Sequence, residues 1–469
     1  MSPTLVWFRR DLRVTDHPAL TAACTAGPVI PVFICDDSVT ALGAAPKWRL
    51  QIGLEQFAKS LQSRGNQLIL RKGDALHVLQ ELIAQTGAKS VFWSRLYDPE
   101  AVERDTKVKA ALKQQGIEAK SFGGHLMFEP WSTQTKTGGF YKVYTPFWKS
   151  LKDRDVEIPL PAPGKIPGPN TWPDSDDLHS WQLGRAMNRG ADVVRPFVRL
   201  GETAAQDRLA HFIETIVAGY GVSRDRPDQD GTSGLSENLA LGEISPHQCW
   251  HAGMRAHHDG KPGAETFLKE LVWREFAYHL MHHTPQILTD NWKPDWDKFA
   301  WNSDPSTDHV QAWMQGRTGL RFVDAALREM YVTGRMHNRG RMIVASYLTK
   351  HLLTDWKIGL KWFEDCLIDW DPASNAMGWQ WSAGSGPDAT PYFRVFNPTT
   401  QLDKFDPQRA YVDRWIGEGK RNPAPDALRY FDAIPRSWNM SVAGTYPEPI
   451  VPADVGRKRA LAAYETRGF

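Results

Sequence analysis

The stretch from Asp355 to Gln401 contains the densest set of side chains that could do chemistry. Two carboxylates, Asp369 and Asp371, flank Trp370, and further tryptophans and an amide follow. A hydrophobic core does not need such groups, because burying them without partners costs several kcal/mol. A site for a large planar polar ligand does need them, since indole rings give stacking faces and carboxylates accept hydrogen bonds. The stretch therefore predicts a ligand site.

Two segments further upstream could complete this site. Gly231–Ser236 is a glycine-rich turn whose amides and hydroxyls can hold phosphate, although such a turn is more often an ordinary helix cap. Within His337–Arg341, Asn338 and Arg341 are three residues apart and share one helical face. An amide can bond a ring nitrogen, and a guanidinium can hold negative charge or pair with Asp369. Without further context this segment would be read as a solvated basic helix face.

A predicted helix upstream carries Glu270 and Trp273, again three residues apart. By itself this pair is typical of a surface carboxylate and a core tryptophan. The end of the same helix carries His279, His282 and His283. No cysteine or carboxylate accompanies them at ligand-like spacing, so the sequence predicts a histidine cluster and no metal site.

Alternating strand and helix signals predict a parallel sheet covered by helices in the first 125 or so residues. Arg9–Arg13 follows the first apolar run in place of a glycine fingerprint, so a dinucleotide-binding Rossmann domain is disfavoured despite the similar architecture. From about Gly201 the hydrophobic period predicts an all-α domain. The expected strands are Thr4–Phe8, Val29–Ile34, Gln67–Leu70 and Val91–Trp93, and the expected helices are His17–Cys24, Trp48–Leu61, Leu76–Ile83, Ala101–Gln114, Ala264–His283, Leu320–Tyr331, Arg339–Leu353 and Lys357–Ile368.

The region between these two parts is rich in glycine and proline, which predicts a long irregular connector. Tyr144–Trp148 interrupts it with aromatic residues and is expected to pack on a domain surface. We therefore predict an α/β domain over residues 1–127, a connector over 128–196 and a helical domain over 197–469.

The composition suits an enzyme of two or more domains, because the chain has 469 residues, of which 41% are hydrophobic. The net charge of +2 means that any nucleic-acid contact must come from a local patch. Four scattered cysteines indicate neither a disulfide framework nor a zinc site. No run of 18 apolar residues is present, and we expect a cytoplasmic protein without membrane association.

Together these motifs resemble the DNA photolyase and cryptochrome family, most closely its class I cyclobutane pyrimidine dimer photolyases. The segments that carry the likeness are Gly231–Ser236, Thr333–Arg341, Asp369–Asn375, Gly378–Trp381 and Pro391–Gln401. The resemblance covers nearly the whole chain. It implies a carbon–carbon lyase that repairs cyclobutane pyrimidine dimers in UV-damaged DNA, in which reduced FAD absorbs light, donates one electron to the dimer and receives it back.

The resemblance implies FAD as the cofactor. It assigns to FAD the residues Tyr220, Thr232, Ser233, Leu235, Ser236, Asn338, Arg341, Asp369, Asp371 and Asn375. The hydroxyl-rich turn would hold the pyrophosphate, and Asn338 would face the flavin N5. The chain departs from the family pattern at Gly234, where some members have arginine, and at Glu237-Asn238, where Pro-His is common. We expect these departures to alter details and not the cofactor.

The same resemblance implies that the damaged bases flip out of the DNA stack into a cavity. The residues it assigns to DNA are Arg224, Glu270, Trp273, Arg339, Met342, Trp381 and Arg394. Glu270 would hydrogen-bond a pyrimidine edge, Trp273 and Trp381 would form apolar walls, and the arginines would hold phosphates.

Five residues receive a catalytic role from the resemblance, namely Glu270, Asn338, Trp379, Trp356 and Trp301. The three tryptophans match the chain through which a surface electron reaches the photoexcited flavin, although their spacing alone suits core packing equally well.

A second, light-harvesting chromophore is also implied for the N-terminal domain. Where folate-binding members have an Asn–Glu pair, this chain has Glu100 and Ala101. A deazaflavin, another flavin, a folate and no antenna at all therefore stay open.

Three alternatives stand beside the main prediction. Six-four photoproduct photolyases have histidines where this chain has Asn338 and Met342, which argues against that activity. A cryptochrome-type blue-light receptor without repair is the second alternative, and the presence of Glu270 and Trp273 argues against it. A light-independent flavin oxidoreductase would need a nicotinamide-binding signature, which the sequence lacks. We expect a monomer that acts on UV-damaged DNA.

Overall fold

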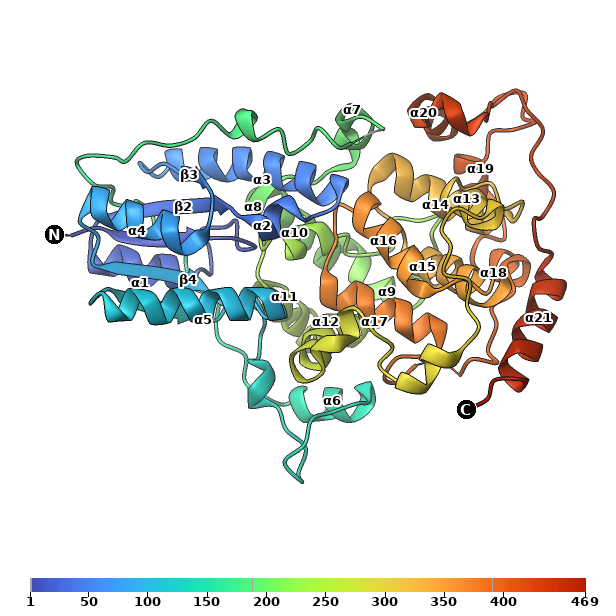
Figure 1. The fold of residues 1–469 in the computed structure, drawn as a ribbon, viewed down its shortest axis with the longest axis horizontal. Coiled ribbons are helices and arrows are strands. Elements are labelled where there is room, and N and C mark those ends of the chain that lie inside the picture. The colour runs from blue at the N-terminus through green and yellow to red at the C-terminus, as the bar shows by residue number, and fades with distance from the viewer. Residues whose placement is uncertain (1, 188, 390) are drawn as a thin grey trace.

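A computed structural model describes residues 2–187, 189–389 and 391–469. An α/β part and a helical part lie side by side along the long axis of the molecule (Figure 1). The α/β part contains one five-stranded parallel sheet in the order β3-β2-β1-β4-β5. The strands are β1 (Thr4–Phe8), β2 (Val29–Cys35), β3 (Ile69–Lys72), β4 (Ser90–Ser94) and β5 (Glu118–Phe122). The parallel sheet and the helical second part confirm the predicted fold class.

Strand β5, at one edge of the sheet, is absent from the sequence prediction because charged residues interrupt it. Its side chains at Glu118 and Lys120 are exposed, so the strand lacks the continuous apolar run that marks the buried strands. Edge strands commonly carry charged residues, which discourage pairing with another chain.

Helices cover both faces of the sheet. On one face Phe8 packs with residues of α1 and α3, and on the other face Trp7 packs with residues of α4 and α5. The helices of this part are α1 (Pro18–Ala26), α2 (Asp37–Thr40), α3 (Ala44–Gln62), α4 (Ala75–Thr86) and α5 (Pro99–Gln114).

The segment after β5 returns along the sheet as a long irregular trace beside β3 and α3 (Figure 1). Backbone hydrogen bonds hold it there, from Val29 to the Pro167 carbonyl at 2.7 Å and from Asp176 to the Leu70 carbonyl at 2.8 Å. Its short elements are η1 (Pro130–Ser132), α6 (Tyr144–Leu151), η2 (Leu178–Trp181), α7 (Ala191–Val194) and η3 (Arg195–Phe197). Helix α6 packs against α12 through aromatic side chains, as expected for this segment.

The helical part begins near residue 201. Its elements are α8 (Gly201–His211), η4 (Phe212–Ile216), η5 (Val217–Gly219), α9 (Tyr220–Ser223), α10 (Ser236–Ala240), α11 (Pro246–His258), α12 (Ala264–His283), η6 (Pro285–Leu288), η7 (Pro294–Lys298), α13 (Asp308–Met314), α14 (Arg321–Thr333), α15 (Asn338–Ser346), η8 (Tyr347–His351), α16 (Trp356–Cys366), α17 (Pro372–Ala383), α18 (Pro398–Phe405), α19 (Ala410–Trp415), α20 (Pro425–Ala433), η9 (Arg436–Trp438) and α21 (Ala453–Glu465). Within the described ranges, no helix combines the length and apolar character needed to cross a bilayer.

One predicted helix is shorter than expected. The hydrophobic period of Arg339–Leu353 predicts a continuous helix, but α15 ends at Ser346 and a π-helical turn, η8, follows. The Thr349 hydroxyl donates to the Ala345 carbonyl at 2.8 Å, which is a side-chain bond of the kind that competes with the regular helix ladder.

A buried ion cluster joins the two parts. Arg49 of α3 donates to Glu243 at 2.6 Å and to Glu237 at 3.3 Å. Arg335 also pairs with Glu237, and the Asn238 amide donates to Glu243 at 2.6 Å. The Glu237-Asn238 pair, which departs from the family pattern, therefore serves the interface between the parts. Removing one member of such a buried pair typically costs about 3–5 kcal/mol.

Candidate active site

A cavity of about 640 Å³ lies among α12, α15, α17 and the Gly231–Ser236 turn. Segments that are far apart in the sequence meet at it, which explains why sequence spacing could not show their contact. The predicted site residues that line it are Tyr220, Arg224, Thr232, Ser233, Leu235, Ser236, Glu270, Trp273, Asn338, Arg339, Arg341, Met342, Asp369, Asp371, Asn375, Trp379 and Trp381. Three predicted residues, Trp356, Trp301 and Arg394, are not part of its lining.

Asp369 presents an unpaired oxygen in the cavity wall. Its side chain is buried, and one carboxylate oxygen accepts a hydrogen bond from Arg341 at 2.7 Å. Arg341 is fixed in turn by donating to the Met336 carbonyl at 2.9 Å. The other oxygen of Asp369 has no partner within the described chain. Because buried polar atoms are nearly always paired, this oxygen marks a position for a ligand N–H or O–H.

Asp371 holds the start of α17 and a neighbouring amide. One carboxylate oxygen caps the helix by accepting from the Ser374 amide at 2.7 Å, and the other accepts from the Tyr278 hydroxyl at 2.5 Å. The Asn375 side chain donates to the Asp371 carbonyl at 3.0 Å. This arrangement fixes the amide of Asn375 where α17 borders the cavity.

The Gly231–Ser236 turn is held from outside the cavity by Arg208, which belongs to none of the sequence motifs. Arg208 donates to the carbonyl of Ser233 at 2.8 Å and to that of Thr232 at 2.5 Å. Gly234 has a φ of 61°, and a Cβ there would lie 2.6 Å from the Arg199 guanidinium. Glycine adopts this left-handed conformation without strain, and a larger side chain here would have to displace the Arg199 guanidinium. With its carbonyls bound behind it, the turn directs hydroxyls toward the cavity.

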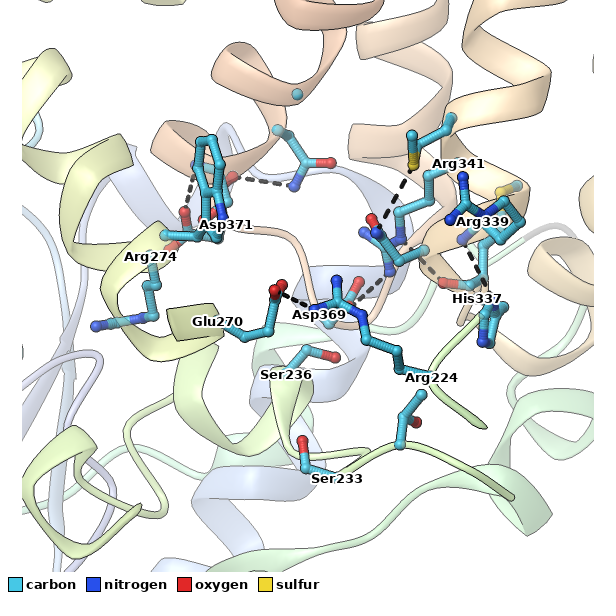
Figure 2. A pocket seen from close by; sticks show the side chains of 18 of the residues that line it. Arg224, Ser233, Ser236, Glu270, Arg274, His337, Arg339, Arg341, Asp369 and Asp371 are labelled. Atoms are coloured by element: carbon cyan, nitrogen blue, oxygen red, sulfur yellow. Dashed lines mark hydrogen bonds and ion pairs between the residues drawn. The ribbon is translucent and has the colours of Figure 1, made fainter. Parts of the chain in front are cut away.

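Two of the three arginines predicted to hold DNA phosphates are paired with carboxylates. Figure 2 shows Arg224 and Glu270 pointing toward one another above Ser233 and Ser236, and the structure records an ion pair between them. Arg339 pairs with Asp225 at 2.6 Å.

Arg394 stands apart from these two arginines. It is exposed and lies outside the cavity lining, in the segment between α17 and α18. Its backbone carbonyl accepts a hydrogen bond from the buried Lys350 at 3.0 Å.

The two indoles of the cavity wall, Trp273 and Trp381, have different surroundings. Trp273 stacks on Tyr144 of α6 with ring centroids 3.7 Å apart and an interplanar angle of 5°. Trp381 lies on α17, across from α12. Met342 lies with its sulfur 3.9 Å from the Asn338 amide nitrogen, so these two side chains share one region of the wall. Tyr144 was not singled out as a site residue, because it lies in the connector and shares no motif with Trp273.

The three tryptophans of the predicted electron path have different environments. Trp379 lines the cavity, and its close ring neighbours are Trp313 at 6.1 Å and Phe363 at 4.9 Å. Trp356 is fully buried and donates to Asn291 at 2.9 Å. Trp301 is half-buried and packs against the same hydrophobic cluster that contains the other two. The structure thus brings the three into one cluster, without a close ring contact between Trp379 and Trp356 in the described chain.

A second cavity of about 330 Å³ lies between the connector and the helical part. Tyr331, Trp362 and Trp438 give it aromatic walls. Arg189 reaches into this region and donates to the Cys366 carbonyl at 2.7 Å, while its Nε and the indole nitrogen of Trp362 are buried without partners in the described residues. A planar ligand with acceptor atoms would satisfy both groups.

Glu100 and Ala101, at the positions where folate-binding members have an Asn–Glu pair, do not line this second cavity. Glu100 is an exposed acid in the first turn of α5, and Ala101 is buried behind it. At the nearby carboxyl ends of the strands, ion pairs join Arg9 to Asp105 at 3.1 Å and Arg104 to Asp36 at 2.8 Å. Paired side chains therefore occupy the space at the carboxyl ends of the strands.

The histidine cluster of α12 serves packing. His279 accepts a hydrogen bond from the Tyr141 amide at 3.1 Å, and His283 stacks on Phe140. Among the residues that the structure describes, no group of three histidine, cysteine or acidic side chains is arranged to hold a metal ion.

Comparison with known proteins gives consistent matches along the chain. Residues 4–164 match the DNA photolyase family model, and residues 267–466 match the model of the FAD binding domain of DNA photolyase. The deoxyribodipyrimidine photo-lyase of Agrobacterium fabrum is 44% identical, covering 99% of this chain and 98% of that protein. The corresponding protein of Escherichia coli is 35% identical with 99% of both chains covered, and cryptochrome-1 of Arabidopsis thaliana is 32% identical over 97% of this chain and 69% of its own.

Solved structures agree with these matches. A bacterial class III photolyase from Agrobacterium tumefaciens has a TM-score of 0.91 at 43% identity, with 99% of this chain and 97% of that chain covered. An archaeal photolyase from Sulfolobus tokodaii, solved with two FAD molecules, has a TM-score of 0.80 at 26% identity, with 99% of both chains covered.

Proposed function

This chain belongs to the DNA photolyase and cryptochrome family, and we propose that it repairs cyclobutane pyrimidine dimers in UV-damaged DNA by light-driven electron transfer from reduced FAD. The observation that carries this proposal is the single cavity that gathers two different sets of side chains. One set has hydroxyls and carboxylates suited to FAD, and the other has the Glu270 carboxylate beside the Trp273 and Trp381 rings. A shared cavity would hold cofactor and lesion close to each other, as electron transfer requires.

The residues present fit FAD. Thr232, Ser233 and Ser236 supply hydroxyls for a pyrophosphate, and the unpaired oxygen of Asp369 can accept from a ring N–H. At Gly378 an added Cβ would meet nothing within 4 Å, so the wall leaves room there. When bound and reduced, FAD supplies the electron that opens the dimer. The chain's own contribution is to bind and orient the cofactor, to neutralise charge through Arg341 and to exclude water.

Two amides are candidates for the contact with the flavin N5. The resemblance assigns this role to Asn338, which lies beside Met342 and is exposed to the cavity. Asn375 is the alternative, because its amide is buried in the cavity wall and is held by the Asp371 backbone carbonyl. The two positions can be separated by mutation, as described in the Discussion.

The opposite side of the cavity suits a flipped pyrimidine dimer. Trp273 and Trp381 offer apolar ring surface, and Glu270 offers acceptor oxygens to a pyrimidine N–H. In the DNA-free protein Glu270 is paired with Arg224. A DNA phosphate would compete for this arginine and leave the carboxylate free to bind the base.

A second chromophore would fit the aromatic cavity lined by Tyr331, Trp362 and Trp438 better than the carboxyl ends of the strands, where ion-paired side chains fill the space. This position is supported by the unpartnered nitrogen atoms of Arg189 and Trp362. The structure of the Sulfolobus tokodaii relative, described as implying a novel light-harvesting cofactor, supports a two-chromophore design in the family. The division into residues 1–127, 128–196 and 197–469 remains our proposal for the domains. With this placement the antenna would contact all three, the first of them through Ala44 of α3.

The experiment that tests the function is direct repair. Purified, reduced holoenzyme would be mixed with an oligonucleotide containing one thymine dimer and illuminated with blue light, and the return of base absorbance would be followed. We expect recovery that requires light and that is lost in a Glu270→Ala, Trp273→Ala double variant. An oligonucleotide with a six-four photoproduct is the parallel substrate. Flavin photochemistry without repair of either lesion would contradict the proposal and favour a cryptochrome.

A further inference from the structure

The indole of Trp273 has one of its two faces covered by a ring from another part of the chain. Tyr144, at the start of α6, lies parallel to it at a centroid distance of 3.7 Å and an angle of 5°. Tyr144 is buried and does not line the cavity, whereas Trp273 is half-buried and does. The face of the indole that remains open is therefore the one available to a ligand in the cavity.

Three contacts hold Tyr144 in this position. Its hydroxyl donates to the Lys269 carbonyl at 2.6 Å, and its backbone amide donates to the Asp388 carboxylate at 3.0 Å. Its ring also meets the edge of Phe276 at 5.9 Å. Tyr144 is thus fixed to α12 on one side and to the segment between α17 and α18 on the other.

We propose that Tyr144 is a positioning residue for the lesion site, which holds the Trp273 ring in the plane that receives a flipped pyrimidine. This inference rests on the proposed function and adds a residue outside the cavity to it. A base that stacks on the open face of Trp273 would complete a three-layer stack of base, indole and phenol.

The physical reason is preorganisation. An indole with two free faces can change rotamer, and ordering it on binding costs affinity. A ring already packed against Tyr144 has lost this freedom before the DNA arrives. An offset or parallel aromatic pair contributes a modest stabilising free energy beyond that of its buried area. Losing the Tyr144–Trp273 pair should therefore weaken lesion binding by about two- to tenfold.

Asp388, in the segment that follows α17, helps to hold Tyr144 in place. Its φ of 48° is a left-handed conformation that aspartate, asparagine and glycine tolerate. Its carboxylate links that segment to the connector through the Tyr144 amide.

A double-mutant cycle tests the proposal. FAD-loaded Tyr144→Leu, Trp273→Leu and the combined variant would be compared for dark binding to a thymine-dimer oligonucleotide and to its undamaged counterpart. We expect Tyr144→Leu to weaken binding of the dimer by about two- to tenfold and to change binding of undamaged DNA little. In the Trp273→Leu background the same change should have no further effect. Tyr144→Phe, which keeps the ring, should restore affinity.

The readouts separate positioning from a merely structural role. With saturating DNA, Tyr144→Leu should repair bound dimers at the unmodified rate, so that the change appears in KM and not in kcat. If Tyr144→Leu does not retain FAD, Asp388→Gly removes the carboxylate at a tolerated φ, and Asp388→Asn keeps an acceptor as its matched control. We expect Asp388→Gly also to weaken binding of the thymine dimer, and only when Trp273 is present.

The contradicting outcomes are distinct. The positioning role alone would be refuted if Tyr144→Leu lowered DNA affinity equally in the presence and absence of Trp273. It would also be refuted if affinity fell equally for damaged and undamaged DNA. Unmodified holoenzyme that shows no preference for the dimer would refute the proposed function, and the positioning role with it.

Discussion

Arg341 binds one oxygen of Asp369 at 2.7 Å, and the second oxygen of this buried carboxylate is left without a partner in the described chain. The arginine orients the carboxylate and balances its charge, while the free oxygen can accept a hydrogen bond from a molecule in the cavity. The pair therefore links charge balance inside the protein to recognition of the cofactor.

Substituting Asp369 should weaken binding of FAD. In Asp369→Asn the free acceptor or the ion pair with Arg341 is lost, and a hydrogen bond to a charged group contributes about 1.5–3 kcal/mol. We expect FAD affinity to fall by about ten- to a hundredfold, measured by titrating the apoprotein with FAD and following flavin fluorescence. Asp295→Asn, at an exposed carboxylate paired only with Lys298, is the matched control. Full flavin affinity in Asp369→Asn would contradict this role.

The variants Asn338→Ala and Asn375→Ala should separate the two ends of the cavity. The amide that contacts the flavin N5 will, when removed, change the flavin midpoint potential and the rate at which reduced flavin reoxidises. The other amide will leave these properties nearly unchanged. The resemblance predicts the change for Asn338→Ala. A change found only in Asn375→Ala would move the contact to α17 and place Asn338 with the lesion.

Binding of a second chromophore should depend on Arg189. In Arg189→Ala the buried guanidinium of the aromatic cavity is removed, so a bound antenna should be lost while FAD is retained. The measurement is the absorption spectrum of protein saturated with candidate deazaflavin, flavin or folate pigments. Arg185→Ala, in the same connector but exposed, is the control. Equal pigment binding by both variants would exclude this cavity as the antenna site.

Stability should fall on acidification because burial lowers the pKa of His279, His337 and His351 to about 4. Between about pH 6.5 and pH 4 the unfolded chain binds protons at these histidines and the folded chain does not. Each therefore contributes a loss of up to about 1.4 kcal/mol in unfolding free energy per pH unit as the pH falls through this window. Below the folded pKa the contribution levels off.

His351→Phe isolates one of these contributions. His351 is fully buried and its ring packs near Tyr347 at 5.0 Å, so a phenyl ring can occupy the site without titrating. Thermal unfolding of both proteins, followed between pH 4 and pH 7, should show a shallower loss of Tm for the variant. Parallel curves would mean that His351 titrates alike in the folded and unfolded chain.

The fold class and the cavity lining followed from sequence to different degrees. Buried strands such as β1 were predictable because continuous apolar runs mark them, whereas β5 was not, since an edge strand carries alternating charge. The cavity residues were found because the family motifs contain them. The contacts that fix them, from Arg208 to the hydroxyl-rich turn and from Tyr278 to Asp371, join segments with no local signal and appear only in three dimensions.

The tryptophan path shows the same limit. The family resemblance groups Trp379, Trp356 and Trp301, and in the structure Trp301 packs against the hydrophobic cluster that contains the other two. Their ring contacts are nevertheless set by neighbours from other helices, such as Trp313 beside Trp379, which no spacing rule could supply.

The ion cluster between the two parts has a consequence for synthesis of the chain. Arg49 is translated well before Glu237 and Glu243, the carboxylates that neutralise it. While only the α/β part has left the ribosome, this guanidinium has to stay in water, and the end of α3 cannot close over it. The sheet can form early, but the surface around Arg49 reaches its final packing only when the helical part has folded against it. A fragment cut at the connector would for this reason expose the unfinished face and be prone to aggregate, and the two parts are best regarded as a single unit of expression.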